Sequence, residues 1–344
     1  MPLCAKNVLQ HSDITDISLM KTNLKKGQEK SMKGLEICEK YYLEYGKSML
    51  ENEFADILDK LTVGLFGSGS ECFGFDDEIS QDHDFEPAFC IFIPDESVID
   101  RKTEFLLERA YAKLPKEFMG IKKGFLAPVG GSRHGVIRTS DFVMSKTGTK
   151  DGILTPMNWL MLDENSLLEM TNGKMFFDGL GEVTKIREML SYLPEDIRLK
   201  KLAGNLLIMA QAGQYNYPRC IAHGESGAAQ LAVFEFVRAA INVIFLLNKR
   251  YVPYYKWCFK ALKELKKLSN LSDTLEFLIS SDNDISETKT DIIEDVAKMV
   301  IDELQEQKLT EAICLDLEKH AYSVNDGLSD SEIRNMHILT AIKN

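Results

Sequence analysis

The hydrophobic and polar positions of the chain change their periodicity near residue 190. Before that point, short apolar runs bounded by turn or polar residues predict buried strands at residues 61–66, 89–93, 135–139 and 174–178. Apolar residues at three- and four-residue steps predict amphipathic helices over 31–49 and 97–113, which would cover the sheet. Because Pro87 has no backbone donor, we expect the second strand to lie at an edge, to contain a bulge or to begin late.

After about residue 194 the strand signals stop and helical periodicity takes over. Residues 199–209 and 292–300 each carry one apolar stripe, as amphipathic helices do. Residues 228–247 are apolar nearly all round, which predicts a helix buried inside a bundle. On this helix Glu235 and Arg238 have the three-residue spacing of an ion pair.

These patterns predict an α+β domain with a small mixed sheet at 31–190, followed by an α-helical bundle at 191–344. The polar residues 1–30 are expected to form a loosely ordered lead-in. A length of 344 residues exceeds the size at which a single hydrophobic core usually stops growing, which also favours two domains. The composition, 44% hydrophobic and 27% charged, is that of a globular protein.

The formal charge of -12 disfavours general binding to nucleic acid, which depends on Lys and Arg at phosphates, and suits a neutral or cationic small molecule better. The seven cysteines are scattered without a CxxC pair. The first residues lack a signal peptide, and we find no stretch of about 18 apolar residues. We therefore expect a soluble, cytoplasmic protein without a membrane segment, in a compartment that supplies nucleoside triphosphates and Mg²⁺.

The most informative stretch of the chain runs from Gly67 to Asp84. It begins with the turn Gly67-Ser68-Gly69-Ser70, whose glycines let the backbone approach a polyphosphate and whose hydroxyls can donate to phosphate oxygens. It ends with Asp82-His83-Asp84 before the second strand. Side chains two apart on an extended chain point to the same side, so Asp82 and Asp84 can converge on Mg²⁺ or Mn²⁺. Each feature alone is usually an ordinary turn or a solvated loop, but together they indicate nucleotidyl transfer.

Nucleotidyl transfer usually needs a third carboxylate, which completes a second metal's ligands or accepts the proton of the acceptor hydroxyl. Asp141, after the third predicted strand, is our first candidate, and Asp178 in the fourth is the second. Glu86 is in period with Asp82 and Asp84, but Pro87 follows it and we rank it last. If Asp82 lay in a loop, Asp84 would be the principal ligand and Glu86 would become the second.

The string from Gly67 to Phe85 resembles the nucleotidyltransferase superfamily related to DNA polymerase beta. It resembles a bacterial branch of that superfamily that carries only a domain-of-unknown-function label. The resemblance extends into the helical half, over roughly residues 30 to 270, as in the two-domain aminoglycoside adenylyltransferases. It implies a nucleotidyltransferase domain followed by a helical wall of the cleft, with Arg219 and Lys256 facing the nucleotide and Tyr215 and Tyr255 facing the acceptor. Each of these four also has a structural reading, as an ion-paired, core or interface residue.

The sequence therefore predicts Mg²⁺-dependent transfer of a nucleoside monophosphate, AMP from ATP first of all, to a hydroxyl acceptor with release of pyrophosphate. A small-molecule acceptor is favoured over a tRNA end or a protein side chain, as in toxin-type nucleotidyltransferases. The alternative from another class is a non-catalytic nucleotide-binding or scaffolding module. A helical half that mediates formation of a homodimer is a further alternative.

Overall fold

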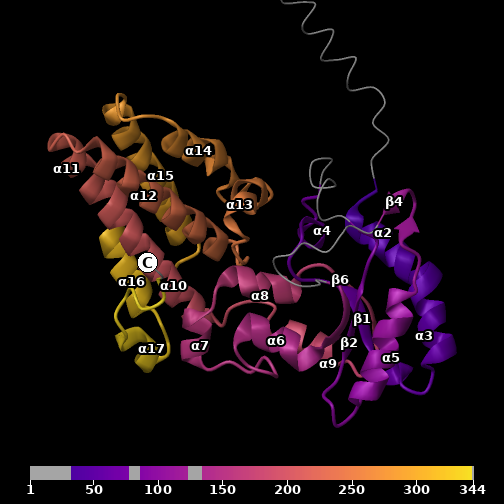
Figure 1. Cartoon of the computed structure of the whole chain (residues 1–344). Coiled ribbons are helices and arrows are strands. Elements are labelled where there is room, and N and C mark those ends of the chain that lie inside the picture. Colours follow the sequence, from indigo (N-terminus) through magenta and orange to yellow (C-terminus); the bar gives the residue numbers. More distant parts are fainter. Residues whose placement is uncertain (1–31, 77–85, 123–133, 343–344) are drawn as a thin grey trace, which may run out of the picture.

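The fold is described from a computed structural model, which describes residues 32–76, 86–122 and 134–342. Asp82 and Asp84 lie outside the described residues. The chain has the mixed α+β class expected from the sequence, with a small sheet in the first half and a helical second half (Figure 1).

The sheet has four strands in the order β5-β2-β1-β6. Its strands are β1 Thr62–Leu65, β2 Cys90–Ile93, β5 Gly135–Arg138 and β6 Lys174–Asp178. All four were predicted from the apolar runs. β2 begins three residues after Pro87, so the late start is the alternative that the structure shows.

The directions of the strands decide which loops meet. β1 is antiparallel to both β2 and β6, whereas β2 is parallel to β5. The end of β1 therefore lies beside the beginnings of β2, β5 and β6. We call this the turn end of the sheet, because the turn at residues 67–70 follows β1 there, and we call the opposite end the far end.

Helices cover one face of the sheet (Figure 1). They are α2 Gly34–Tyr41, the π-helix η1 Tyr42–Gly46, α3 Lys47–Glu53 and α5 Arg101–Ala112. The Tyr42 ring packs edge-on against the Phe89 ring, with their centroids 5.4 Å apart. A side chain at Gly46 would place a Cβ atom 2.4 Å from the Phe89 ring, so only glycine allows η1 to approach the strand this closely. The Asp100 side chain caps α5 by accepting from the Thr103 N–H at 2.8 Å.

The other described elements of the first half are shorter. They are η2 Leu58–Lys60, α4 Ser70–Phe73, β3 Glu117–Phe118, β4 Ile121–Lys122, α6 Thr139–Thr147, α7 Pro156–Met161, α8 Glu164–Thr171 and α9 Glu182–Met189. Buried residues of α7 and α8, among them Trp159 and Leu167, belong to the same hydrophobic core as the helical half. These helices thus join the sheet to the bundle (Figure 1).

The second half is a bundle around α12 Ser226–Leu247. The other described elements are α10 Glu195–Met209, the π-helix η4 Ala210–Asn216, α11 Tyr217–Ala222, α13 Tyr255–Leu262, η5 Ser269–Leu271, α14 Ser272–Ser280, α15 Ser286–Glu306, α16 Leu317–Asp326 and α17 Ser331–Asn335. The predicted pair is confirmed, with Arg238 donating to Glu235 at 2.6 Å. By length and composition α12 could cross a membrane, although no apolar stretch of that length was expected from the sequence; 67% of its most apolar stretch is buried in the bundle.

Candidate functional site

The turn after β1 has a backbone that requires its glycines. Gly67 has φ +121° and Gly69 has φ +144°, both in the region that L side chains rarely adopt. A Cβ atom at Gly69 would also lie 2.3 Å from Oε1 of Glu71, in the short helix α4 that follows. Ser68, between the two glycines, is exposed. The turn therefore exposes Ser68 to solvent. Any residue other than glycine at positions 67 and 69 would strain its backbone.

Asn172 holds this turn from the segment between α8 and β6. Its side-chain oxygen accepts from the Gly67 N–H at 2.9 Å, and its side-chain nitrogen donates to the Gly67 carbonyl at 2.8 Å. The neighbouring Gly173 N–H donates to the Cys72 carbonyl at 3.0 Å. Gly173 also has to be glycine, because a Cβ atom there would lie 2.1 Å from the Leu65 carbonyl oxygen. The start of the turn and the end of α4 are thus tied to the same two residues.

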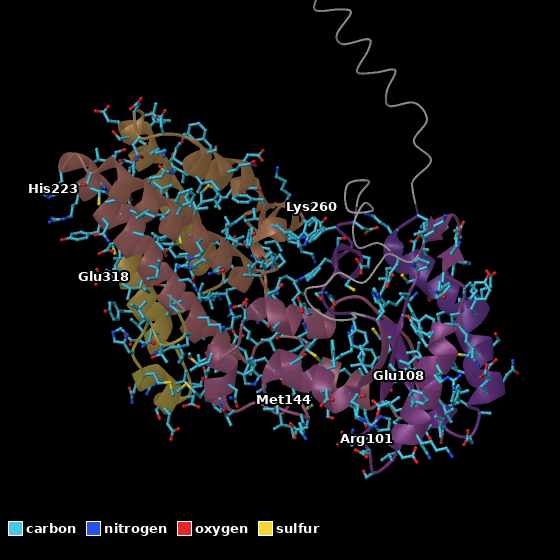
Figure 2. All side chains as sticks on the ribbon, viewed as in Figure 1. Arg101, Glu108, Met144, His223, Lys260 and Glu318 are labelled. Carbon is cyan, nitrogen blue, oxygen red and sulfur yellow. The ribbon has the colours of Figure 1, made fainter. Side chains whose placement is uncertain are left out.

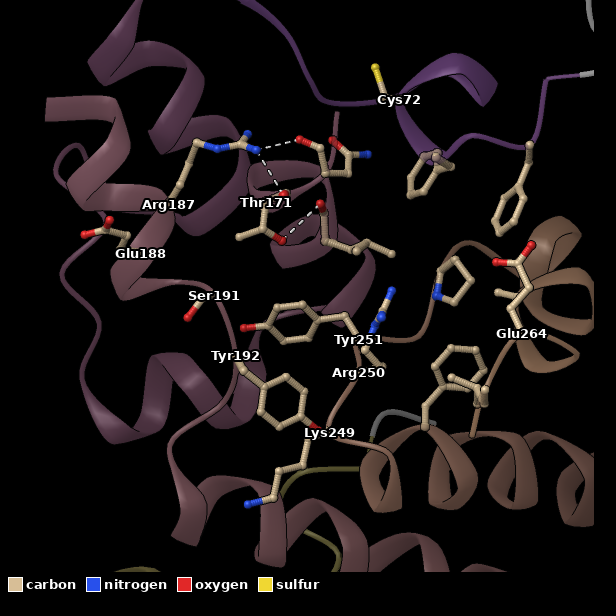
Figure 3. A pocket seen from close by; sticks show the side chains of 18 of the residues that line it. Cys72, Thr171, Arg187, Glu188, Ser191, Tyr192, Lys249, Arg250, Tyr251 and Glu264 are labelled. Carbon is tan, nitrogen blue, oxygen red and sulfur yellow. Dashed lines mark hydrogen bonds between the residues drawn. The ribbon is translucent and has the colours of Figure 1, made fainter. Parts of the chain in front are cut away.

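Arg187 in turn holds Asn172. Its guanidinium donates to the carbonyls of Met170, Thr171 and Asn172 at 2.9, 3.0 and 2.7 Å, and it lies 4.6 Å from the centroid of the Phe66 ring. Figure 3 shows Arg187 reaching the main chain beside Thr171. Burial lowers the pKa of Arg187. The side chain therefore connects α9, the end of α8 and the residue just before the turn.

Carboxylates gather at the turn end of the sheet. Burial raises the pKa of Cys38 to about 12, and the negative charges of Glu71, Glu86 and Asp76 raise it as well. Asp76 is only 5% exposed, and its Oδ2 accepts from the Gly34 N–H at 2.8 Å. Its Oδ1 is buried without a hydrogen bond among the described residues, and the Lys33 ammonium is 3.6 Å away. Glu86 Oε1 lies 2.9 Å from Nδ1 of His134, just before β5.

Asp76 and Glu86 flank, in the sequence, the segment that contains the predicted metal ligands. Asp82 and Asp84 belong to residues 77–85, which lie outside the described residues. The described residues on either side of this segment are Asp76 and Glu86, and both lie at the turn end. Within the described part of the chain, no three His, Cys, Asp or Glu side chains converge on a point that could hold a metal ion.

The two preferred candidates for the third carboxylate lie at the far end of the sheet, contrary to expectation. Asp178 ends β6 and pairs with Thr62 at the start of β1. Its carboxylate accepts from the hydroxyls of Thr62 and Thr184, both at 2.7 Å, and from the N–H groups of Gly181 and Thr184. Burial alone would raise the pKa of Asp178, but these hydrogen bonds lower it overall. Asp178 thus fixes the start of α9.

Asp141 is exposed in the first turn of α6, three residues beyond Arg138. Because β5 is parallel to β2, Arg138 pairs with Ile93, and the chain leaves β5 at the far end. Glu86 is the candidate that lies at the turn end, although Pro87 caused it to be ranked last. The two-residue spacing between Asp84 and Glu86 was the sequence signal that favoured Glu86 as a candidate carboxylate.

A cleft of about 650 Å³ separates the sheet from the bundle beside the turn. Asn172 and Arg187 line it from the first half, and Lys249, Arg250 and Tyr251 line it from the second (Figure 3). Three basic side chains, Arg187, Lys249 and Arg250, therefore line this cleft. Arg187 donates to main-chain carbonyls on its own side of the cleft. The Lys249 ammonium lies 3.3 Å from Oε2 of Glu195.

The helix α13 closes the other side of this cleft. Lys260 donates to the Phe75 carbonyl at 3.0 Å, and the Trp257 ring lies 5.5 Å from the Phe75 ring. Figure 2 shows Lys260 on the side of the bundle that faces the sheet. Lys256 is exposed on the same helix, 4.8 Å from the Trp257 ring. Tyr255 begins the helix and is 74% exposed.

Arg219 and Tyr215 are not near the turn. Arg219 lies 5.0 Å over the Tyr215 ring, and both belong to the region of η4 and α11. This region is at the end of the bundle that is remote from the sheet, where Figure 2 labels His223 (Figures 1 and 2). The structure therefore brings neither residue to the predicted nucleotide or acceptor site.

Asn172 and Arg187 were missed from the sequence. Asn172 lies 105 residues from Gly67, and no local spacing connects the two. The one available signal was the Asn-Gly pair after a helix, which indicates a turn and no more.

Comparison with known proteins gives one family match. A family model described as a domain of unknown function (DUF4037) matches residues 159–258. No curated protein matches the chain. The matched residues run from α7 to α13, so they include Asn172, Arg187 and the helical wall of the cleft and exclude the turn itself.

Proposed function

We propose that this protein is a Mg²⁺-dependent nucleotidyltransferase that transfers a nucleoside monophosphate, AMP from ATP first of all, to a hydroxyl acceptor and releases pyrophosphate. One observation carries the proposal. The glycine turn, held by Asn172, lies at the same end of the sheet as Asp76 and Glu86, the described residues that flank the segment containing Asp82 and Asp84. A phosphate-binding turn beside converging carboxylates is what such a reaction requires.

The turn would bind the triphosphate through Ser68, Gly69 and Ser70. The Gly67 N–H is already bound by Asn172, so its role is to fix the turn. Among the described residues, the backbone N–H groups of Ser68 and Ser70 have no acceptor, and the Ser68 side chain is exposed. These groups can donate to phosphate oxygens without first breaking a hydrogen bond.

The turn end of the sheet suits a hard divalent cation. Glu71, Asp76 and Glu86 each place negative charge near Cys38, and Oδ1 of Asp76 is buried without a hydrogen bond among the described residues, with the Lys33 ammonium 3.6 Å away. Oxygen ligands and negative charge are what Mg²⁺ or Mn²⁺ prefers. In the proposal Asp82 and Asp84 hold the ion, which when bound stabilises charge on the attacking and leaving oxygens.

Glu86 is the carboxylate that we propose as the third. His134 lies 2.9 Å from Glu86 Oε1 and fixes the orientation of the carboxylate, which in the proposal accepts the proton of the acceptor hydroxyl. Arg250 and Lys249 in the cleft, and Lys256 on α13, supply positive charge for the nucleotide from the helical wall. A small-molecule acceptor agrees with the overall charge of -12. We further propose that the protein acts in the cytoplasm.

The reaction can be tested with each labelled nucleoside triphosphate and Mg²⁺, together with pools of small molecules, tRNA and proteins. The expected result is pyrophosphate release and an acceptor whose mass has increased by one nucleotide. Binding of ATP that needs no metal and leads to no transfer would indicate a nucleotide-binding module instead. Isothermal titration with and without Mg²⁺ distinguishes these two outcomes.

A further inference from the structure

The helical half contains a second cavity, of about 620 Å³, that the proposed reaction does not use. Its walls come from α8, α10, α12, α13 and the residues before α13. It shares only Pro253 with the cleft beside the turn. The segment from Tyr251 to Tyr254 thus contributes residues to both cavities.

One wall of this cavity holds a buried ion pair. Glu164 Oε1 lies 3.7 Å from the Lys201 ammonium, and these side chains are 13% and 7% exposed. Oε2 of Glu164 accepts from the Val252 N–H at 3.3 Å. Burial raises the pKa of Glu164, and the charge of Lys201 opposes this. A carboxylate with one cation at 3.7 Å and a long hydrogen bond has unused capacity as an acceptor.

A second acceptor lies next to it in the sequence. Oδ1 of Asn165 is buried without a hydrogen-bond partner among the described residues, while its Nδ2 donates to Glu169 at 3.2 Å. Buried polar atoms in native proteins nearly always have a partner, so this oxygen calls for a donor.

The basic groups of the cavity are already engaged. The Lys201 ammonium faces Glu164 and also donates to the Leu162 carbonyl at 3.3 Å. Arg238 donates to Glu235 at 2.6 Å. The wall therefore has more unused acceptors than unused donors, and a ligand that donates N–H groups matches it.

The opposite wall is apolar and aromatic. Ile241 and Phe259 line it, and the exposed rings of Phe234, Tyr254 and Tyr255 lie at its border. The rings of Tyr254 and Tyr255 lie 4.3 Å apart. Exposed aromatic rings beside a cavity with a few buried polar groups are the usual composition of a small-molecule site.

We propose that this cavity is a binding site for a small organic amine, with the ammonium group directed at Glu164 and Asn165 and an aromatic or branched apolar body against Phe259 and Tyr255. The positive charge would be attracted by Glu164, and the N–H groups would satisfy Oδ1 of Asn165. Asp163, which also lines the cavity, adds negative charge on the same side. The site does not depend on the proposed nucleotidyl transfer, because no residue of the turn contributes to it.

Three phenyl compounds of similar size test the proposal on the whole chain of 344 residues. They are 2-phenylethylamine, 2-phenylethanol and phenylacetate, which differ in charge, and binding at millimolar concentration can be followed by saturation-transfer NMR. We expect the amine to bind, the alcohol to bind about tenfold more weakly and the acid to give no signal. Equal binding of the three, preference for phenylacetate or no binding of any probe would overturn the proposal.

Variants locate the binding. Asn165→Ala and Tyr255→Ala should each weaken the amine several-fold, whereas Asn270→Ala, at an exposed position away from the cavity, should not. Glu164→Gln should remove the preference for the amine over the alcohol. If Glu164→Gln fails to fold, because Lys201 is then buried without its partner, Tyr255→Ala still decides the question, since this side chain is largely exposed. Undiminished amine binding in both Asn165→Ala and Tyr255→Ala would place the amine elsewhere and contradict the proposal.

Discussion

Asn172 binds both main-chain polar groups of Gly67, its side-chain oxygen accepting from the N–H at 2.9 Å and its nitrogen donating to the carbonyl at 2.8 Å. An uncharged amide can accept through its oxygen and donate through its nitrogen at the same time. It fixes the turn in the absence of any ligand. Binding of a triphosphate would then not have to pay the entropy of ordering Gly67.

We expect Asn172→Ala to lower the affinity for ATP and to reduce the free energy of unfolding by about 1–3 kcal/mol, because two buried main-chain groups lose their partners. The KM for ATP and urea denaturation measure the two effects. Asn270→Ala, the same substitution at an exposed position, serves as the control. An unchanged KM for ATP together with an unchanged free energy of unfolding would show that the two hydrogen bonds between Asn172 and Gly67 have no role.

A second prediction concerns Gly69, which has a positive φ and also faces Glu71. Gly69→Ala should cost about 1–3 kcal/mol from backbone strain and a further amount from the displaced Glu71 side chain. Gly74→Ala is the comparison with a milder change, since Gly74 has the left-handed helical conformation at φ +72° and ψ 15°, which strains alanine less, and no atom within 4 Å of its Cβ position. Thermal unfolding should therefore show a larger loss for Gly69→Ala than for Gly74→Ala. Equal losses would mean that Glu71 does not restrict the turn.

Asp178 should affect stability and not chemistry. Hydrogen bonds lower its pKa in the folded state. A lowered pKa stabilises the fold above the unfolded value of about 3.9, and this contribution is lost as the pH falls through the lower, folded value. Asp178→Asn should thus be less stable than the wild type at pH 7, and the difference should shrink in acid. Urea denaturation at several pH values measures this, and a difference that grows in acid would contradict the sign.

Glu86 and Asp141 give opposite predictions for catalysis. Glu86 lies at the turn end and Asp141 is exposed beyond the far end. Glu86→Gln should lower kcat by a factor of about 10² to 10⁴, the usual contribution of a general base, with little change in the KM for ATP. Asp141→Asn should leave kcat unchanged. A large loss in Asp141→Asn with none in Glu86→Gln would reverse the assignment.

The sequence was sufficient to predict the fold class, the four strands of the sheet and several of the helices. Period-two and period-3.6 patterns located the four strands of the sheet and the main helices, because burial on one face leaves a direct record in the order of residues. Strand order and direction leave no such record. Asp141 and Asp178 follow or end strands just as a third carboxylate would, and only the parallel pairing of β5 with β2 and the antiparallel pairing of β6 with β1 place them at the far end.

The supports of the turn were beyond prediction for a related reason. Asn172 and Arg187 act through contacts between segments that are distant in the sequence, and their residue types are common in loops and helices. Arg219 and Tyr215 show the converse. The resemblance to a known family suggested that both residues face the site, but η4 and α11, which contain them, lie at the end of the bundle that is remote from the sheet.

The central claim is that Asp82 and Asp84 hold the metal for nucleotidyl transfer beside the turn. The most direct test is release of pyrophosphate from ATP with Mg²⁺ and acceptor, measured for the wild type, Asp82→Asn and Asp84→Asn, with folding checked by circular dichroism. We predict turnover in the wild type and its loss in both folded variants. Transfer that persists in both variants at the wild-type rate would contradict the account.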